Sequence, residues 1–129
     1  MTLAYWMILV AAFLPYMGTA YAKFSQGGGS TYDNHAPRVQ AETLPPQRKR
    51  AYWAQLNSFE AFPPFAAGVI VAHLAGASQP TIDVLAVAFV ALRVIYTGCY
   101  VYDRATARSL VWAAALACVV GLFFAAAAA

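Results

Sequence analysis

The sequence predicts an all-α integral membrane protein, built as a four-helix bundle. Hydrophobic residues make up 62% of the 129-residue chain and charged residues 10%, whereas soluble domains contain about 45–50% and about 25%. Four apolar runs have lengths close to the roughly 20 residues that a helix needs to cross the hydrocarbon core, and they cover residues 3–22, 51–75, 81–102 and 109–128. We therefore expect one domain, residues 1–129, surrounded by membrane lipids.

The first run, residues 3–22, carries Tyr5 near one end and Tyr21 near the other. Aromatic residues at both ends are typical of a membrane-spanning helix. A cleaved signal peptide is the alternative, because Ala20-Tyr21-Ala22 resembles a small-x-small cleavage site. The missing positive segment at the start and the length of the run favour the span.

The loop charges predict the topology of the chain. The polar loop 24–49 ends in a basic cluster, the turn at 76–80 has no Lys or Arg, and the last turn contains Arg104 and Arg108. Cytoplasmic loops carry an excess of Lys and Arg. We therefore expect the loop 24–49 and the last turn in the cytoplasm. The net charge of +3 carries no nucleic-acid signature.

A polar stripe runs through the second span. Arg50, Trp53, Asn57 and Glu60 are three or four residues apart, so they share one helix face. An ionisable residue inside a membrane span is costly and suggests a functional site. The alternative is a polar cluster that only packs helices together.

The third span has a matching face, formed by Arg93, Tyr96, Tyr100 and Arg104. Arg93 and Glu60 lie at similar depths on adjacent helices, which predicts an ion pair within or between subunits. Tyr96 would then lie near the level of Asn57, and Tyr100 near that of Trp53.

These two faces predict a polar cleft that opens toward the basic rim and suits a small anionic ligand with several hydrogen-bonding groups. In the alternative, the tyrosines only pack between helices, with their hydroxyl groups bonded across them. No metal site is expected, because Cys99, Cys118, His35 and His73 lack ligand spacing.

The segment 49–63, Lys-Arg-Ala-Tyr-Trp-Ala-Gln-Leu-Asn-Ser-Phe-Glu-Ala-Phe-Pro, resembles the second-helix signature of the MAPEG family, the membrane-associated proteins in eicosanoid and glutathione metabolism. That signature is Glu-Arg-x-x-Arg-Ala-x-x-Asn-x-x-Glu, followed by Phe-Pro. Arg93, Tyr96 and Tyr100 resemble the third-helix pattern Arg-x-x-Tyr-x-x-x-Tyr, and residues 107–112 resemble the start of the fourth helix. The chain is most similar to the short bacterial-type members.

The resemblance implies a homotrimer in a bacterial inner membrane, with glutathione bound between neighbouring subunits. It implies a glutathione-dependent transferase or peroxidase that acts on lipophilic electrophiles. The implied glutathione-binding residues are Arg50, Gln55, Asn57, Glu60, Arg93, Tyr96 and Tyr100. The implied catalytic residues, which would support the glutathione thiolate, are Arg104, Arg108 and Tyr100.

Two positions depart from the family signature. Trp53 stands where the family has an arginine, and Lys49 stands where it has the opening glutamate. These departures keep a second interpretation open, a non-catalytic membrane subunit or scaffold with the same fold. A small transporter is a weaker alternative, because no span is repeated.

Overall fold

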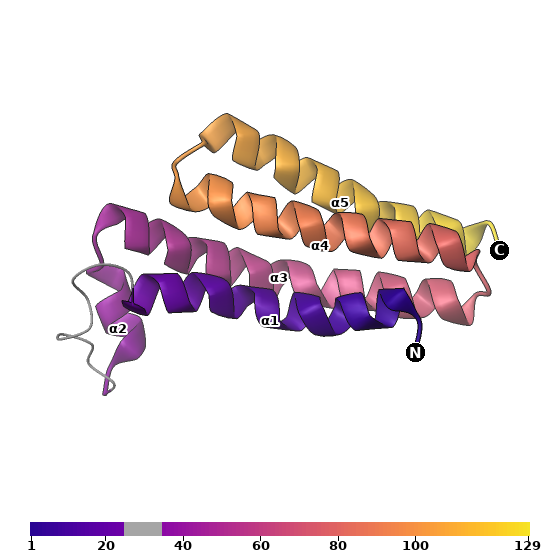
Figure 1. Cartoon of the computed structure of the whole chain (residues 1–129), viewed down its shortest axis with the longest axis horizontal. Helices are drawn as coiled ribbons and strands as arrows, with labels where there is room; N and C mark the ends of the chain where they lie inside the picture. The colour runs from indigo at the N-terminus through magenta and orange to yellow at the C-terminus, as the bar shows by residue number, and fades with distance from the viewer. Residues whose placement is uncertain (25–34) are drawn as a thin grey trace.

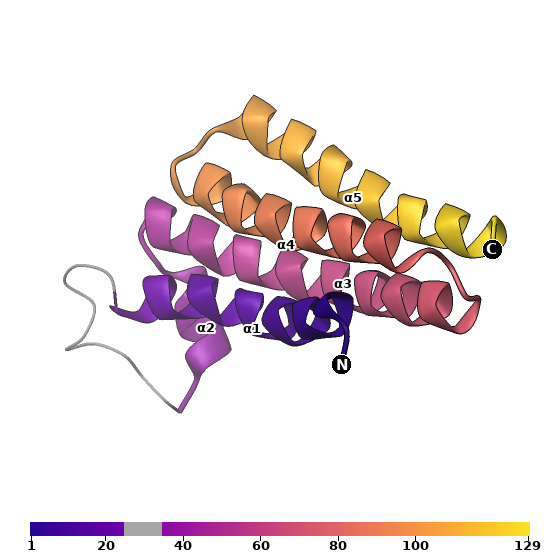
Figure 2. The ribbon, with the colours of Figure 1, turned by 45° about the vertical axis from the view of Figure 1, so that its right-hand side comes forward.

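The computed structural model describes residues 1–24 and 35–129, and these residues form helices and turns without a strand. The four long helices of the described residues lie side by side and alternate in direction, and both chain termini lie at one end (Figure 1). A short helix lies at the opposite end, and α5 diverges from α4 there in both views (Figure 2). The helices are α1 (Leu3–Phe24), α2 (Pro37–Glu42), α3 (Pro46–Leu74), α4 (Gln79–Val101) and α5 (Ala105–Ala127).

Three of the helices, α1, α4 and α5, are long and apolar enough to cross a membrane. The longest helix is α3, with 29 residues, but its basic first turns and its mid-helix pair Asn57 and Glu60 make it less apolar. The helix that we expect to carry many of the functional residues is therefore also the most polar of the long helices.

Two helices begin about one turn or more before the apolar runs, and α4 begins two residues before its run. α3 begins at Pro46 instead of residue 51, and α5 begins at Ala105 instead of residue 109. Proline is favoured in the first turn of a helix, and Arg, Lys and Ala are good helix formers, so polar ends extend both helices. The predicted loop 24–49 contains α2, while its residues 25–34 lie outside the described part.

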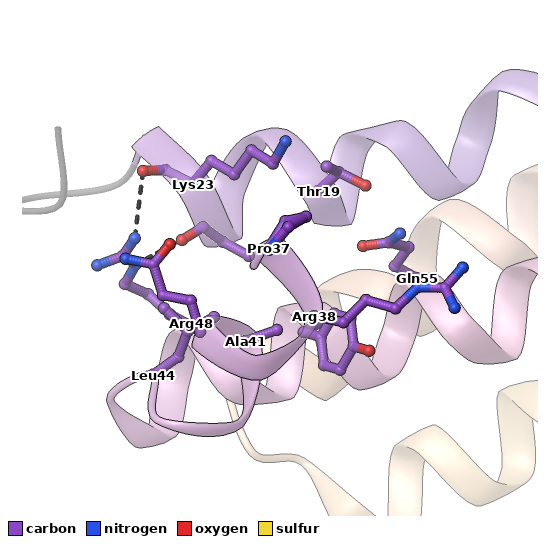
Figure 3. Close-up of a pocket in the computed structure, with 11 residues that line it drawn as sticks. Thr19, Lys23, Pro37, Arg38, Ala41, Leu44, Arg48 and Gln55 are labelled. Carbon is purple, nitrogen blue, oxygen red and sulfur yellow. Dashed lines mark hydrogen bonds between the residues drawn. The ribbon is translucent and has the colours of Figure 1, made fainter. Parts of the chain in front are cut away.

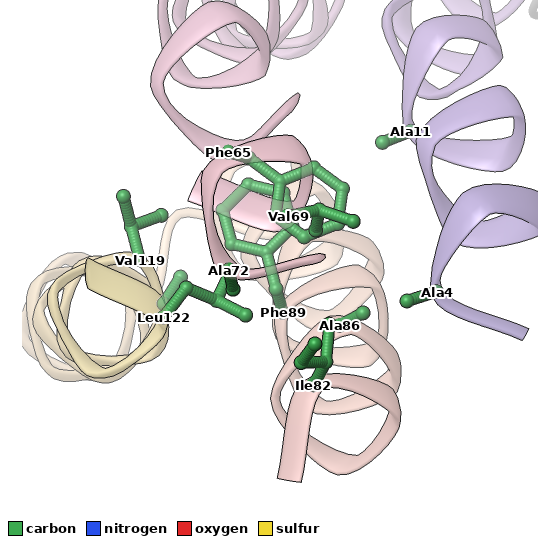
Figure 4. Close-up of a cluster of buried hydrophobic side chains, with 11 residues drawn as sticks. Ala4, Ala11, Phe65, Val69, Ala72, Ile82, Ala86, Phe89, Val119 and Leu122 are labelled. Atoms are coloured by element: carbon green, nitrogen blue, oxygen red, sulfur yellow. The ribbon is translucent and has the colours of Figure 1, made fainter. Parts of the chain in front are cut away.

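The core is built from α3, α4 and α5, with α1 covering one side (Figure 4). Phe65 of α3 and Phe89 of α4 stack with ring centroids 4.0 Å apart. α1 approaches α3 so closely at Gly18 that an added Cβ atom would lie only 2.7 Å from the carbonyl oxygen of Ala51. Small residues at such contacts let helix backbones approach each other within a membrane.

The corner between α3 and α4 holds the start of α1. One carboxylate oxygen of Asp83 accepts hydrogen bonds from the backbone N–H of Ala4 and from the side chain of Gln79, both at 2.8 Å. The ring of His73 is hydrogen-bonded to the hydroxyl group of Thr2 at 3.0 Å. Asp83, near the start of α4, therefore also caps the start of α1.

Candidate functional site

The buried guanidinium of Arg93 lies at the centre of the candidate site. Its side chain is 2% exposed, and its Nη2 donates to the Oδ1 of Asn57 at 3.0 Å and to the hydroxyl oxygen of Ser58 at 3.1 Å. The guanidinium carbon lies 4.1 Å from the ring centroid of Tyr96. A positive charge inside the helices is thus held by two acceptors and one aromatic face.

Asn57 joins Arg93 to Glu60. Its amide Nδ2 donates to the Oε2 of Glu60 at 3.3 Å, while its Oδ1 accepts from Arg93. The predicted direct ion pair between Glu60 and Arg93 is therefore wrong within one subunit, where the described residues form only one salt bridge and it involves neither of them. The amide of Asn57 can bond to both Arg93 and Glu60 because it carries an acceptor and two donors.

Two polar groups of this cluster have unused bonding capacity. The carboxylate of Glu60 is exposed on α3, in the middle of an apolar surface. The Nε atom of Arg93 is buried and makes no hydrogen bond to the described residues. Buried polar atoms nearly always have a partner, so the cluster has both a donor, the Nε of Arg93, and an acceptor, the Glu60 carboxylate, that can form further hydrogen bonds.

Tyr100 lies beside the cluster, in a group of aromatic and basic side chains. Its ring centroid is 6.4 Å from that of Trp53, as the predicted depths require, and 5.6 Å from that of Tyr96. The guanidinium carbon of Arg108 lies 4.4 Å from the Tyr100 ring centroid. Arg108 of α5 therefore places a positive charge close to any anion that binds next to Tyr100.

Arg104 does not share the face of Tyr100, so that prediction is wrong. The helix α4 ends at Val101, and the chain turns at Asp103, which has a φ of 58°. The turn takes Arg104 off the helix face and leaves it exposed, while Arg108 one turn into α5 stacks on Tyr100. A positive φ at a non-glycine residue depends on local tertiary contacts and is uncommon.

Arg50 lies at the end of the cluster and holds two helices together. Its Nε donates to the carbonyl oxygen of Val101 at 3.3 Å, and its Nη1 lies 3.7 Å from the carboxylate of Asp103. Asp103 is largely exposed, so this ion pair adds little stability. The bond to Val101 places Arg50 where α4 ends.

Gln55 lies apart from the cluster within one subunit. It lines a pocket of about 170 Å³ between α1, α2 and α3 (Figure 3). Its neighbours there include Lys23 of α1, Arg38 of α2 and Arg48 of α3. Sequence reasoning missed this pocket, because α2 forms one of its walls and a six-residue helix leaves no clear periodic signal.

A second opening lies between α4 and α5, next to the cluster. It has a volume of about 420 Å³ and is lined by Tyr96, Arg108, Ser109, Trp112 and Ala113. Trp112 is exposed on α5, so the opening combines an apolar side with the guanidinium of Arg108. Sequence reasoning also missed Ser58 as an acceptor of Arg93, since it lies one position off the polar stripe.

A comparison with known proteins identifies the family of the chain. No curated protein and no solved structure matches the chain. The MAPEG family profile matches residues 3–128, which is almost the whole sequence. With three apolar helices of membrane-spanning length, this chain is a membrane protein that belongs to the MAPEG family.

Proposed function

We propose that this protein is a membrane-bound, glutathione-dependent transferase or peroxidase that acts on lipophilic electrophiles and works as a homotrimer. The observation that carries the proposal is the chain of contacts from buried Arg93 through Asn57 to exposed Glu60. A charge inside a span costs about 2.5–3.5 kcal/mol on insertion scales. An exposed carboxylate at this depth is therefore best explained by a ligand or a neighbouring subunit that covers it.

The residues present fit glutathione. The tripeptide has an ammonium group, two carboxylates, two amides and a thiol, so it needs both an anionic partner and cationic partners. Glu60 suits the ammonium group, Asn57 the amides, and Arg50 and Arg93 the carboxylates. The exposed carboxylate of Glu60 accepts a hydrogen bond from Asn57 and can accept another from the ammonium group.

The separation of Gln55 from this cluster favours an assembly. Gln55 lies in the pocket under α2, whose lining includes neither Asn57 nor Glu60, so the three side chains do not face one common pocket in a single subunit. If a neighbouring copy places its Gln55 side against the cluster, Gln55 of that copy lies near Asn57 and Glu60 of the first. Binding between subunits, with three copies as the resemblance implies, accounts for both observations.

When bound, glutathione supplies its sulfur as the nucleophile, which is reactive as the thiolate. Arg108 offers a positive charge near Tyr100, and the Tyr100 hydroxyl can donate a hydrogen bond to the same anion. Both groups stabilise negative charge at the sulfur before it attacks. The opening beside Trp112 gives a lipophilic electrophile a path from the bilayer to this point.

The test is a titration of the purified protein with glutathione, following the ultraviolet absorbance of the thiolate. Arg108→Leu should abolish the absorbance change and reduce turnover about 100-fold, the loss typical of removing one group that stabilises developing negative charge. Arg104→Leu should cost much less, because Arg104 is away from Tyr100. Equal losses for the two variants would contradict the role of Arg108.

One observation favours the second candidate, a non-catalytic subunit. Trp53 replaces the family arginine and is 43% exposed, so a cation for a glutathione carboxylate is missing at that position. The ammonium group of Lys49 lies 5.6 Å from the Trp53 ring centroid and partly compensates. Trp53→Arg should raise glutathione affinity in a transferase, whereas a scaffold should show no glutathione-dependent rate in either form.

A further inference from the structure

Ser58 of α3 follows Asn57 in the sequence and lies in the interior of the subunit. It is 5% exposed, and its hydroxyl group donates to the carbonyl oxygen of Ala54, four residues earlier, at 2.8 Å. A hydroxyl group has one hydrogen and two lone pairs, so the bond to Ala54 leaves Ser58 only the capacity to accept. Its own helix therefore orients Ser58 to accept a hydrogen bond from a cation.

Two consecutive residues of α3 bind one nitrogen atom of Arg93. Its Nη2 carries two hydrogens, and it lies 3.0 Å from the Oδ1 of Asn57 and 3.1 Å from the Oγ of Ser58. The guanidinium carbon also lies 4.1 Å from the ring centroid of Tyr96. Three contacts therefore hold the guanidinium, and Ser58 supplies the more deeply buried of the two acceptors.

The position of Arg93 decides which way the amide of Asn57 points. Arg93 only donates hydrogen bonds and an ionised carboxylate only accepts them, so the Oδ1 of Asn57 faces Arg93 and its Nδ2 faces Glu60. One hydrogen of Nδ2 bonds to the Oε2 of Glu60 at 3.3 Å, and the other has no acceptor within the part of the chain that the structure describes. Asn57 thus offers a donor, and Glu60 an acceptor, in a fixed arrangement.

We propose that Ser58 is a positioning residue of the glutathione site, which holds the guanidinium of Arg93 and, through it, the amide of Asn57 in the orientation that binds the tripeptide. The inference rests on the proposed function and assigns to Ser58 a role in binding alone. Groups that are fixed before binding lose less conformational entropy when the ligand binds. Without the Ser58 hydroxyl group, one N–H of Nη2 loses its acceptor, and Arg93 no longer fixes the amide.

Ser58 should affect the binding of glutathione and not the stabilisation of its thiolate. Arg108 and Tyr100, which stack on each other, make no hydrogen bond to Ser58 within the described residues. Ser58→Ala should raise the dissociation constant and the KM for glutathione about tenfold, the factor that corresponds to one hydrogen bond of about 1.4 kcal/mol. The kcat and the thiolate absorbance at saturating glutathione should change by less than about twofold.

The test combines calorimetric titration, steady-state kinetics and thermal melting of the full chain in detergent. Ser58→Thr keeps the hydroxyl group and should restore the wild-type affinity, because threonine can also bond to a carbonyl oxygen four residues earlier. The matched control is Thr97→Val on α4. It removes a hydroxyl group that is bonded to the backbone carbonyl oxygen of Arg93 at 3.1 Å and not to the guanidinium, so it should leave the KM unchanged.

A merely structural role would lower the melting temperature and the amount of active protein, and so reduce kcat at an unchanged KM. That result would overturn the proposal, as would an equal rise of the KM in Thr97→Val. A Ser58→Thr variant that melts like wild type but binds like Ser58→Ala would also overturn it. If the extra methyl group lowers the melting temperature of Ser58→Thr, the comparison of Ser58→Ala with Thr97→Val still decides.

Each of these outcomes leaves the proposed function intact, because wild type still binds glutathione in all of them. A wild type that binds no glutathione would instead overturn the proposed function, and the positioning role of Ser58 would fall with it.

Discussion

Polar side chains gather in two regions of α3 and α4, and the regions differ in how fully those side chains are bonded. At the corner between the two helices, Asp83 accepts the N–H of Ala4, and His73 is bonded to Thr2. In the cluster around Arg93, the carboxylate of Glu60 is exposed, and one guanidinium nitrogen makes no hydrogen bond within the part of the chain that the structure describes. The polar groups of the first region are hydrogen-bonded to other residues of the same chain. The second region still contains groups that can form further hydrogen bonds.

This difference separates a structural role from a functional one better than residue type does. Both regions contain a carboxylate inside a largely apolar chain, so residue type alone does not tell them apart. Because buried polar groups are normally paired, the unpaired ones indicate where a ligand or another subunit belongs. We therefore expect the two regions to respond differently to mutation.

The largest expected effect is that of Asn57→Leu on stability. This change removes an acceptor of the buried Arg93 guanidinium and the donor to Glu60. A hydrogen bond to a charged group contributes about 1.5–3 kcal/mol, so the free energy of unfolding should fall by about that amount. Thermal melting in detergent measures the change.

The matched control is Gln55→Leu, on the same helix but outside the cluster. Its effect on stability should stay within about 0.5 kcal/mol, as for most surface substitutions. Similar losses in the two variants would mean that Asn57 does not hold Arg93, and the cluster would lose its central contact.

The next prediction compares the two carboxylates directly. Asp83→Ala removes the cap of α1 and should lower stability by about 1 kcal/mol, with unchanged glutathione affinity. Glu60→Gln alters an exposed side chain, so it should leave the melting temperature nearly unchanged and weaken glutathione binding about tenfold or more. Thermal melting measures the stability of both variants, and calorimetric titration measures their glutathione affinity. If both variants changed the same property, the two regions would not differ in role.

The sequence was sufficient for the parts of the fold that depend on local pattern. Apolar runs located the long helices, and the three- and four-residue spacing placed Trp53 and Tyr100 at the same level, where their rings meet. These features follow from helix geometry, which is the same wherever a helix forms. The membrane class follows from composition in the same way.

The contacts that depend on turns and side-chain conformations could not be read from spacing. Arg108 replaces Arg104 beside Tyr100 because the chain turns at Asp103. Asn57 stands between Glu60 and Arg93 because an amide can bond to both. The pocket of Gln55 needs α2, whose six residues are too few for a periodic signal. Each case requires knowing which atoms meet, and equal depth along neighbouring helices does not determine that.

The smallest expected effect concerns the order of two coupling energies. In double-mutant cycles measured by thermal melting, Asn57 and Arg93 should couple by about 1 kcal/mol or more, because they are bonded directly. Glu60 and Arg93 should couple by less, because Asn57 lies between them. The variants Asn57→Leu, Glu60→Gln and Arg93→Leu supply both cycles. A larger coupling for Glu60 with Arg93 would show that the two charges meet directly, and since they do not within one subunit, the contact would have to join neighbouring copies. Repeating that cycle after the assembly is dissociated in harsher detergent would then abolish the coupling, whereas a coupling through Asn57 would persist in the separated chain.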